Sequence, residues 1–420
     1  MSLQVRRSIL RRFGPLFVFA GLLLTFSNSN LFADDENYQT YPLGEQASGM
    51  GGAYTALSES SEGTYYNPAG IARGASYSTI SLSATAFRWT FGSIGNAIAL
   101  SPTRRANYRV SAIQFLPTST AYLKKLKEGR VVGFSLYLQD ASLFTGRNKI
   151  ENVFFSQRLS NQMLWIGPSF GQAINDRLMV GAGIYLLNRD FVREVYVRSE
   201  GATVSQQFQS TDVTYRAILP LLGVKYDLTP ELKLGATLRP YYSIRLAGSG
   251  EIHINNNTSE TILSGLKIDS PTPIRGDFGV AWQVPGRWTI SGDASINLPH
   301  TFVQVHDPQG RFADAKVRQE WTFNGAVGTE YYLGRSWPIR FGVFTDLSSA
   351  PSLKSSDPNI VTRIDFLGTT ASIGYLTEHS TIAVGAQYSH GFGKATNPVG
   401  DPQGFTLSIL NLFFAGSYRF

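Results

Sequence analysis

Residues 287–298 read RWTISGDASINL, and this stretch alternates strictly between two kinds of side chain. The even-numbered positions, from Trp288 to Leu298, are apolar or small, whereas the odd-numbered positions, from Arg287 to Asn297, are polar or charged. Successive side chains of a β-strand point to opposite faces, so this strand has one face suited to lipid and one suited to water. Residues 274–284 repeat the pattern, and Pro285-Gly286 joins the two stretches as a tight turn.

Similar alternation recurs in fourteen segments, an even number as expected for a single-chain bacterial barrel. The segments lie near residues 75–88, 106–116, 130–142, 157–173, 177–192, 211–228, 231–247, 273–284, 286–298, 317–333, 337–349, 362–376, 380–391 and 405–420. Those near 157–173, 211–228 and 362–376 alternate poorly, which leaves their registers open. The sequence therefore predicts an all-β fold, a 14-stranded antiparallel transmembrane β-barrel over residues 75–420, in the outer membrane of a Gram-negative bacterium.

The connections between these segments fall into two length classes. Short turns lie at 175–176, 229–230, 285–286, 334–336 and 378–379, and we expect them on the periplasmic side. Longer polar connections lie near 143–156, 193–210, 248–272, 299–316, 350–361 and 392–404, and we expect them on the extracellular side. Thr118 to Gly129 reads as a helix-like connection with a solvated basic face. Trp282, Trp288 and Trp337 adjoin short turns, where aromatic rings are expected at a membrane interface.

Residues 1–33 have the pattern of a secretory signal peptide. Four arginines precede an apolar run over residues 13–26, and a polar break and Ala33 follow. The run is shorter than the ~20 residues of a spanning helix, so we place the mature start near Asp34. Without the leader, 33 basic residues face 30 acidic ones, scattered singly, which argues against a nucleic-acid partner.

No residue pattern points to catalysis or to a bound cofactor. The chain has no cysteine, which excludes disulfides and thiolate metal sites. Its five histidines have no metal-ligand spacing, and no nucleophile elbow, phosphate loop or dinucleotide fingerprint occurs. We therefore expect no enzyme activity, no cofactor and no metal.

Residues 34–74 lie ahead of the first strand and do not alternate. They contain the small-residue stretch Gly49-Met50-Gly51-Gly52-Ala53-Tyr54 and then the triplet Asn67-Pro68-Ala69. Glycine and alanine let backbone pack closely in a confined space, and Asn-Pro opens a turn. We predict that residues 34–74 form an N-terminal plug, or hatch, inside the barrel.

These two motifs, their spacing, the strand number and the terminal Phe420 resemble the FadL family of outer-membrane long-chain fatty acid transporters. Sharp similarity covers residues 41–74, and the remainder matches in architecture. The resemblance implies an N-terminal hatch in a fourteen-stranded barrel, a hydrophobic binding site inside it, and lateral exit of substrate through the wall beside a kinked third strand.

Carried over to this sequence, Asn67, Pro68 and Ala69 are the hatch motif that faces the wall opening. Gly133, on the predicted third strand, is our candidate for the kink, because glycine tolerates a bend. For both, the alternative is a plain structural role as a turn and a small lumen residue. Tyr418 and Phe420 end an alternating last strand and resemble the signal that the barrel-assembly machinery reads.

Large apolar residues on the predicted lumen face favour a hydrophobic cargo over a sugar or an ion. The candidate pocket consists of Met179, Tyr185, Leu187, Tyr241, Tyr332, Phe344 and Phe413. The alternative is that these residues pack the plug. Arg239 and Arg275 are candidates for binding a carboxylate head group, unless they pair with neighbouring acidic residues.

The sequence thus predicts a monomeric, lipid-embedded transporter for passive uptake of long-chain fatty acids or similar hydrophobic small molecules. Two alternatives stay open. One is a barrel component of a protein secretion or surface-attachment system, and the other is a general diffusion porin.

Overall fold

A computed structural model describes residues 37–38, 41–74, 78–99, 105–200, 204–240, 244–311, 313–352, 362–396 and 402–420. The predicted signal peptide, residues 1–33, lies outside the described residues, and so does Tyr241 of the predicted pocket.

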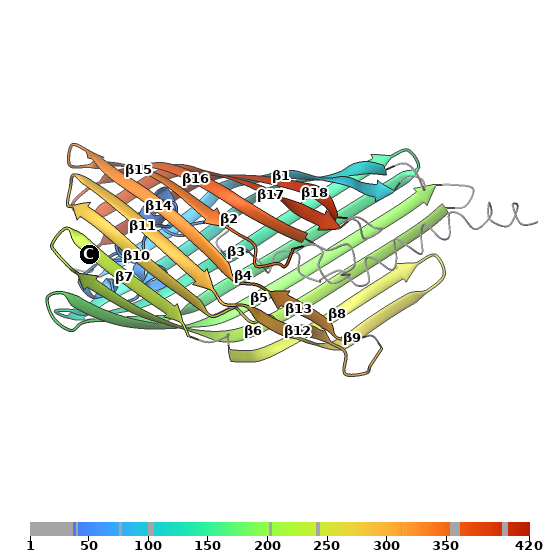
Figure 1. Cartoon of the computed structure of the whole chain (residues 1–420), viewed down its shortest axis with the longest axis horizontal. Coiled ribbons are helices and arrows are strands. Elements are labelled where there is room, and N and C mark those ends of the chain that lie inside the picture. Colours follow the sequence, from blue (N-terminus) through green and yellow to red (C-terminus); the bar gives the residue numbers. More distant parts are fainter. Residues whose placement is uncertain are drawn as a thin grey trace, which may run out of the picture.

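The described strands form one continuous antiparallel sheet (Figure 1). Their bounds are β1 Thr79–Ala99, β2 Arg105–Lys127, β3 Arg130–Ile150, β4 Val153–Ala173, β5 Leu178–Glu200, β6 Val204–Asp227, β7 Leu232–Arg239, β8 Ile244–Asn256, β9 Glu260–Ile268, β10 Arg275–Val284, β11 Trp288–Asn297, β12 His300–His306, β13 Ala315–Gln319, β14 Thr322–Leu333, β15 Trp337–Asp346, β16 Thr362–Leu376, β17 Ser380–Thr396 and β18 Pro402–Arg419.

These eighteen segments make a ring of fourteen barrel strands in the described part of the chain. Four of the barrel strands are each interrupted once, giving the consecutive pairs β7 and β8, β9 and β10, β11 and β12, and β13 and β14. For example, β6 pairs with β7 at Leu222 and with β8 at Ile218. Pairing of β1 with β18, from Thr79 opposite Arg419 to Ile94 opposite Phe405, closes the ring. The predicted fourteen-stranded barrel is confirmed.

The strands are longer than predicted at the end opposite the short turns. β3 and β4 pair as far as Ile150 and Val153, and β5 and β6 pair as far as Glu200 and Val204. Most of the predicted loops at 143–156 and 193–210 are therefore strand, and the expected helix-like connection from Thr118 to Gly129 is the last part of β2 and its turn. Strand residues that do not face lipid can be polar on both faces, so the alternation in the sequence stops before the strands end. The predicted short turns are present at 175–176, 229–230, 285–286, 334–336 and 378–379.

The two faces of the barrel wall differ as the alternation predicts. Phe278, Val280 and Ile290 point outward and are exposed, whereas Asp277 and Ser291 point inward and are buried. Trp282 and Trp288 pack edge to face beside their turn, with ring centroids 4.8 Å apart. The barrel thus presents an apolar outer band with aromatic residues at its short-turn end, as lipid contact requires.

The described residues before β1 include three single-turn helices, α2 Gln46–Gly49, α3 Gly63–Tyr66 and α4 Ile71–Gly74. In the described part of the chain, no helix is long and apolar enough to cross a membrane. Figure 1 shows these blue segments inside the ring, at the end where the short turns lie.

Small residues on the inner wall make room for residues 41–74. A Cβ atom on Gly328 or Gly342 would overlap Met50 or Gly51, and a Cβ atom on Gly181 or Gly223 would overlap the Asn67-Pro68-Ala69 triplet. These glycines lie on β14, β15, β5 and β6, so the segment meets the wall on several sides. Backbone thereby approaches backbone closely, which only glycine permits.

The outward face of β10 offers a test of lipid contact. Phe278 is 62% exposed and lies four residues from Trp282 at the aromatic end, roughly 10 Å into the apolar band at ~3.3 Å per residue with strand tilt. We expect Phe278→Arg to destabilise the barrel by ~2–4 kcal/mol relative to Phe278→Leu. Urea unfolding in phospholipid vesicles, followed by gel mobility, measures the difference. Equal stability of the two variants would show that lipid does not contact this face.

Candidate functional site

The wall of the barrel is interrupted between β2 and β3. The two strands pair at Ser111 opposite Thr145 and again from Ser119 opposite Tyr137, with no paired residues recorded in between. We call residues 112–118 of β2 and 138–144 of β3 the wall interruption. Within it, Pro117 has no N–H to donate to a ladder. The register of β3 against β4 shifts by one residue at Gln139, which marks a bulge.

The kink predicted at Gly133 is therefore misplaced. Gly133 pairs in regular register with Leu123 of β2 and Ser169 of β4. A Cβ atom there would lie 2.8 Å from Thr64 Cγ2, so this glycine makes room for the N-terminal segment. The bulge at Gln139 supplies the irregularity instead, and the sequence at that point has no glycine to signal it.

The Asn67 side chain ties two parts of the N-terminal segment to the wall. Asn67 Nδ2 donates to the carbonyl of Thr55 at 3.0 Å and to that of Val224 on β6 at 2.9 Å. Its Oδ1 atom accepts from the N–H of Ala69 at 3.1 Å. The Asn67 backbone is extended, as expected for a residue before proline. The triplet contacts β5 and β6 rather than the wall interruption that it was expected to face.

Buried charges anchor the N-terminal segment elsewhere. Asp293 Oδ2 on β11 accepts the N–H groups of Tyr54 at 2.9 Å and Thr55 at 2.8 Å. Arg340 on β15 bridges Glu45, at 3.1 Å, to the wall residue Glu330, at 2.6 Å.

A second ionic anchor lies on the side of β6 and β7. Glu59 pairs with Lys225 and, at 2.6 Å, with Lys233. Arg73 pairs with Asp227 at 2.7 Å. These polar contacts specify one docked position. Apolar packing adds to them, because Tyr41 and Leu43 join a buried cluster with wall residues and Ile71 packs on Leu123 and Val131.

Glu62 joins the two halves of the segment. Its carboxyl group accepts the N–H groups of Glu45, of Gln46 at 3.0 Å and of Ala47 at 3.1 Å, at the start of α2. Burial, together with the nearby Glu45, raises the pKa of Glu62 from 4.5 to about 7, although the three backbone N–H groups oppose the shift. Near neutral pH this carboxyl group is therefore only partly ionised.

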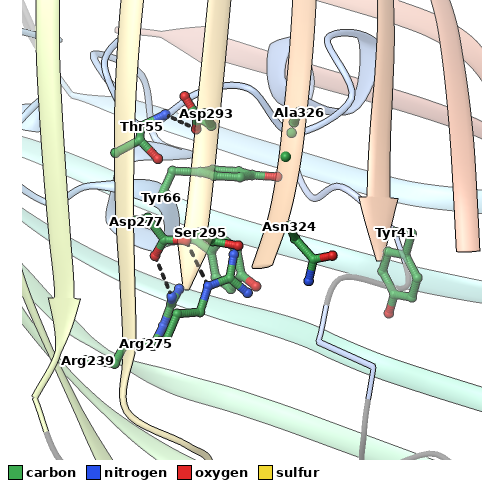
Figure 2. Close-up of a pocket in the computed structure, with 13 residues that line it drawn as sticks. Tyr41, Thr55, Tyr66, Arg239, Arg275, Asp277, Asp293, Ser295, Asn324 and Ala326 are labelled. Carbon is green, nitrogen blue, oxygen red and sulfur yellow. Dashed lines mark hydrogen bonds and ion pairs between the residues drawn. The ribbon is translucent and has the colours of Figure 1, made fainter. Parts of the chain in front are cut away.

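Among the described residues, two chambers lie between the N-terminal segment and the wall. The smaller has about 470 Å³ of empty space and the larger about 630 Å³, each including space open to solvent, and both are lined by Tyr65, Arg239 and Arg275. Figure 2 shows the smaller chamber, with Arg239 and Arg275 both directed at Asp277. The Arg239 Nη1 to Asp277 Oδ2 distance is 2.9 Å, and the Arg275 Nε to Asp277 Oδ1 distance is 2.8 Å.

Both aromatic rings and polar groups line these chambers. The guanidinium carbon of Arg239 lies 5.6 Å from the ring centroids of both Tyr65 and Trp165. Arg239 Nε and Trp165 Nε1 have no hydrogen-bond partner among the described residues. The chambers can therefore hold an apolar body against the rings and satisfy a polar end with free donors.

The larger chamber reaches the wall interruption. Gln139 and Asp140, the residues at the bulge of β3, line it together with Met163 and Trp165 of β4. Tyr41 adjoins the same place, because its hydroxyl donates to the carbonyl of Leu138. Burial raises the pKa of Tyr41, so that the hydroxyl stays protonated and acts as the donor.

No family model matches the sequence. A long-chain fatty acid transport protein of Escherichia coli O6:H1 is 25% identical over 186 residues, which are 40% of this chain and 41% of the relative. The match thus spans less than half of that relative's length.

The solved structures agree in fold over nearly the whole chain. A Pseudomonas aeruginosa FadL homologue superposes with a TM-score of 0.70 at 12% identity, covering 91% of this chain and 100% of that one. The Ralstonia pickettii toluene transporter TbuX superposes with a TM-score of 0.62 at 14% identity, with the same coverage. This chain therefore has the barrel fold of these two structures.

The six described residues of the predicted pocket lie outside the two chambers. Met179 packs on Ala69 and Ala72, and Phe344 packs on Ala53, as the plug-packing alternative requires. Tyr185 and Leu187 belong to a buried cluster with Tyr41 and Leu43 of the N-terminal segment. Tyr332 is half-buried on β14. Phe413 is buried on β18, and its ring packs so closely on Gly385 of β17 that a Cβ atom on this glycine would overlap it.

The predicted head-group residues do line the chambers, although they pair with Asp277 as the alternative expected. Sequence reasoning missed Tyr65, Met163 and Trp165. Met163 and Trp165 lie on β4, whose poor alternation left its register open. Tyr65 lies outside the strands, so no alternation in the sequence predicts the direction of its side chain. Tyr418 and Phe420 are exposed on the outer surface, where Phe420 exchanges backbone hydrogen bonds with Ser78.

A substitution at Gly223 tests the docking of Asn67. A side chain there would overlap Asn67 Oδ1, so we expect Gly223→Val to displace residues 67–72 from the wall, at a cost of ~1–3 kcal/mol. Gly292→Val is the matched control, because its Cβ would meet only a carbonyl oxygen at 3.9 Å. Hydrogen exchange at residues 67–72 should quicken at least tenfold in the first variant only. Similar exchange in both variants would contradict the docked position.

The raised pKa of Glu62 predicts a pH-dependent docking. The Glu62 carboxyl group binds its proton more tightly when the segment is docked, so protonation stabilises the docked state. This stabilisation is complete below pH 4.5 and is lost as the pH rises through about 7. Exchange at residues 45–47, corrected for its intrinsic rate, should be faster at pH 8 than at pH 5.5. Glu62→Gln should abolish the difference, and a pH dependence that survives this change would refute the assignment.

Proposed function

We propose that this chain takes up hydrophobic or amphipathic small molecules, such as long-chain fatty acids, by passive diffusion across the outer membrane. The observation that carries the proposal is the position of the larger chamber. It lies between the N-terminal segment and the wall and is lined by Gln139 and Asp140 at the wall interruption. A molecule in this chamber needs only a local opening of the wall to reach the lipid bilayer.

Apolar residues continue from the chambers towards the far end of the barrel. Along the inner face of β5, Tyr185 and Leu187 are followed by Phe191, Val195 and Val197, all buried. The last two join a cluster formed with inner residues of β2, β4, β16 and β18. Each methylene of an acyl chain transferred from water to such surfaces contributes ~0.8 kcal/mol, which provides affinity without any chemical step.

In this proposal the segment 34–74 is the hatch. Its polar anchors hold it across the lumen, and substrate passes when the contacts around Tyr41 and the chambers yield. The names of two similar proteins support the proposal, since one describes transport of long-chain fatty acid and the other transport of toluene. Arg239 is the proposed ligand of a carboxylate head group, because its Nε atom keeps a free donor in spite of the pairing with Asp277.

The proposal also includes the surroundings of the barrel. The apolar outer band contacts outer-membrane lipid, and the last strand, with Tyr418 and Phe420, is read by the barrel-assembly machinery. The barrel acts as a monomer, because the route from chamber to wall lies within one chain.

Uptake of oleate by cells that lack the native gene tests the proposal. The wild-type gene should restore uptake, and Asn67→Ala should restore less than a fifth of it. The alanine leaves the buried carbonyl groups of Thr55 and Val224 without a donor, at ~1–3 kcal/mol each. This displaces the part of the segment that carries Tyr65 and so disturbs the lining of both chambers.

Asn148→Ala, at the far end of β3 and outside the lining of both chambers, is the control and should restore full uptake. Oleate uptake that is unchanged by deleting the gene would refute the transport function. Stable open channels in planar bilayers would instead identify a general porin.

A further inference from the structure

Arg88 on β1 is a buried cation with free hydrogen-bond donors. Its side chain is 1% exposed, and its Nε and Nη1 atoms have no acceptor among the described residues. The other inward-facing arginines described above, Arg239, Arg275 and Arg340, each pair with a carboxylate. A buried guanidinium group that lacks such a partner is costly, and an anion that enters the lumen would relieve that cost.

Two carboxamides flank Arg88 on the neighbouring strands. Asn411 on β18 and Gln114 on β2 are its direct register partners, so all three side chains point into the lumen side by side. Both amide atoms of Asn411 and the Oε1 atom of Gln114 also have no partner among the described residues. A planar guanidinium group with adjacent amide N–H donors is a suitable set for binding a carboxylate oxygen pair.

Tyr41 covers this set. Its ring centroid lies 5.3 Å from the guanidinium carbon of Arg88, and the same residue lines the smaller chamber. Its hydroxyl donates to the carbonyl of Leu138 at the wall interruption. The Tyr41 side chain therefore contacts Arg88, the smaller chamber and the wall interruption at once.

We propose that Arg88, Asn411 and Gln114 form a second binding site, for the oxyanion head group of an amphipathic cargo, which becomes accessible when Tyr41 moves aside. The inference rests on the proposed function and deepens it. The head group would pass from Arg239 in the chamber to Arg88 beside the wall interruption, while the apolar tail leads through the wall. The cargo class is then a long-chain carboxylate rather than a neutral hydrocarbon.

Ligand binding to the purified full chain in nonionic detergent tests the site. Oleate and oleyl alcohol have the same apolar chain and differ in the charge of the head group. We expect Arg88→Gln to weaken oleate binding at least tenfold and to change oleyl alcohol binding less than twofold. Arg88→Lys should fall between, since it keeps the charge and loses the planar pair of donors. Arg109→Gln, which removes an exposed charge from β2, should bind both ligands as the wild type does.

The outcomes separate the site from the proposed function. Wild-type protein that binds neither ligand would overturn both. Binding of both ligands with an equal loss, or with no loss, in Arg88→Gln would overturn the site and leave uptake of hydrophobic molecules standing. Should Arg88→Gln fail to fold, Asn411→Leu keeps the charge and decides the matter. It should weaken oleate binding at least threefold and spare oleyl alcohol, and equal effects on both would overturn the site.

Discussion

The backbone ladder between β1 and β18 is the interaction on which the rest of the structure depends. A strand edge that faces lipid leaves N–H and C=O groups without partners, and each costs several kcal/mol. The ladder from Thr79 opposite Arg419 onward removes both edges at once. Closure also fixes which side chains face inward, because the pleat alternates around the whole ring. The polar residues that alternation places inside then need partners of their own.

The N-terminal segment supplies many of those partners. Asp293 receives two backbone N–H groups from it, and Arg340 and Lys225 receive carboxylates. Backbone at Met50 and Gly51 lies close to wall glycines on β14 and β15. Contacts of this kind specify one docked arrangement, beside the apolar packing of Tyr41 and Leu43 against the wall. They can be exchanged for contacts with water or with a ligand's head group, which suits a part of the molecule that moves.

Sequence reasoning succeeded where a repeating physical constraint acts. Lipid on one side and water on the other impose the alternation at residues 287–298, and the same constraint gives the fourteen barrel strands and the outward aromatic residues. It failed where no such constraint applies. The strands extend to Ile150 and Glu200, but polar residues on both faces there leave no alternation that would predict them. Residues 118–129 look helical in isolation, yet pairing with β1 and β3 makes them strand.

The site was predicted only in part for similar reasons. Arg239 and Arg275 lie on strands with clear alternation, so their inward direction was readable. Trp165 lies on a strand without it, and the bulge at Gln139 is set by pairing partners far away in the sequence. A register shift between Thr85 and Phe87 changes the alternation in β1, and Arg88 then points inward. The sequence gives no sign of this shift or of the missing acceptor for Arg88 among the described residues. Such features depend on which strands become neighbours.

The central claim is that the segment docked in the lumen must shift for cargo to pass. The chain has no cysteine, so a single engineered disulfide can test this directly. Ala53 of the segment and Ala326 of β14 belong to one buried cluster, and the pair Ala53→Cys and Ala326→Cys places one thiol on the segment and one on the wall. Oleate uptake should fall at least fivefold when the disulfide forms and recover on reduction. Full uptake with the disulfide quantitatively formed would contradict the account.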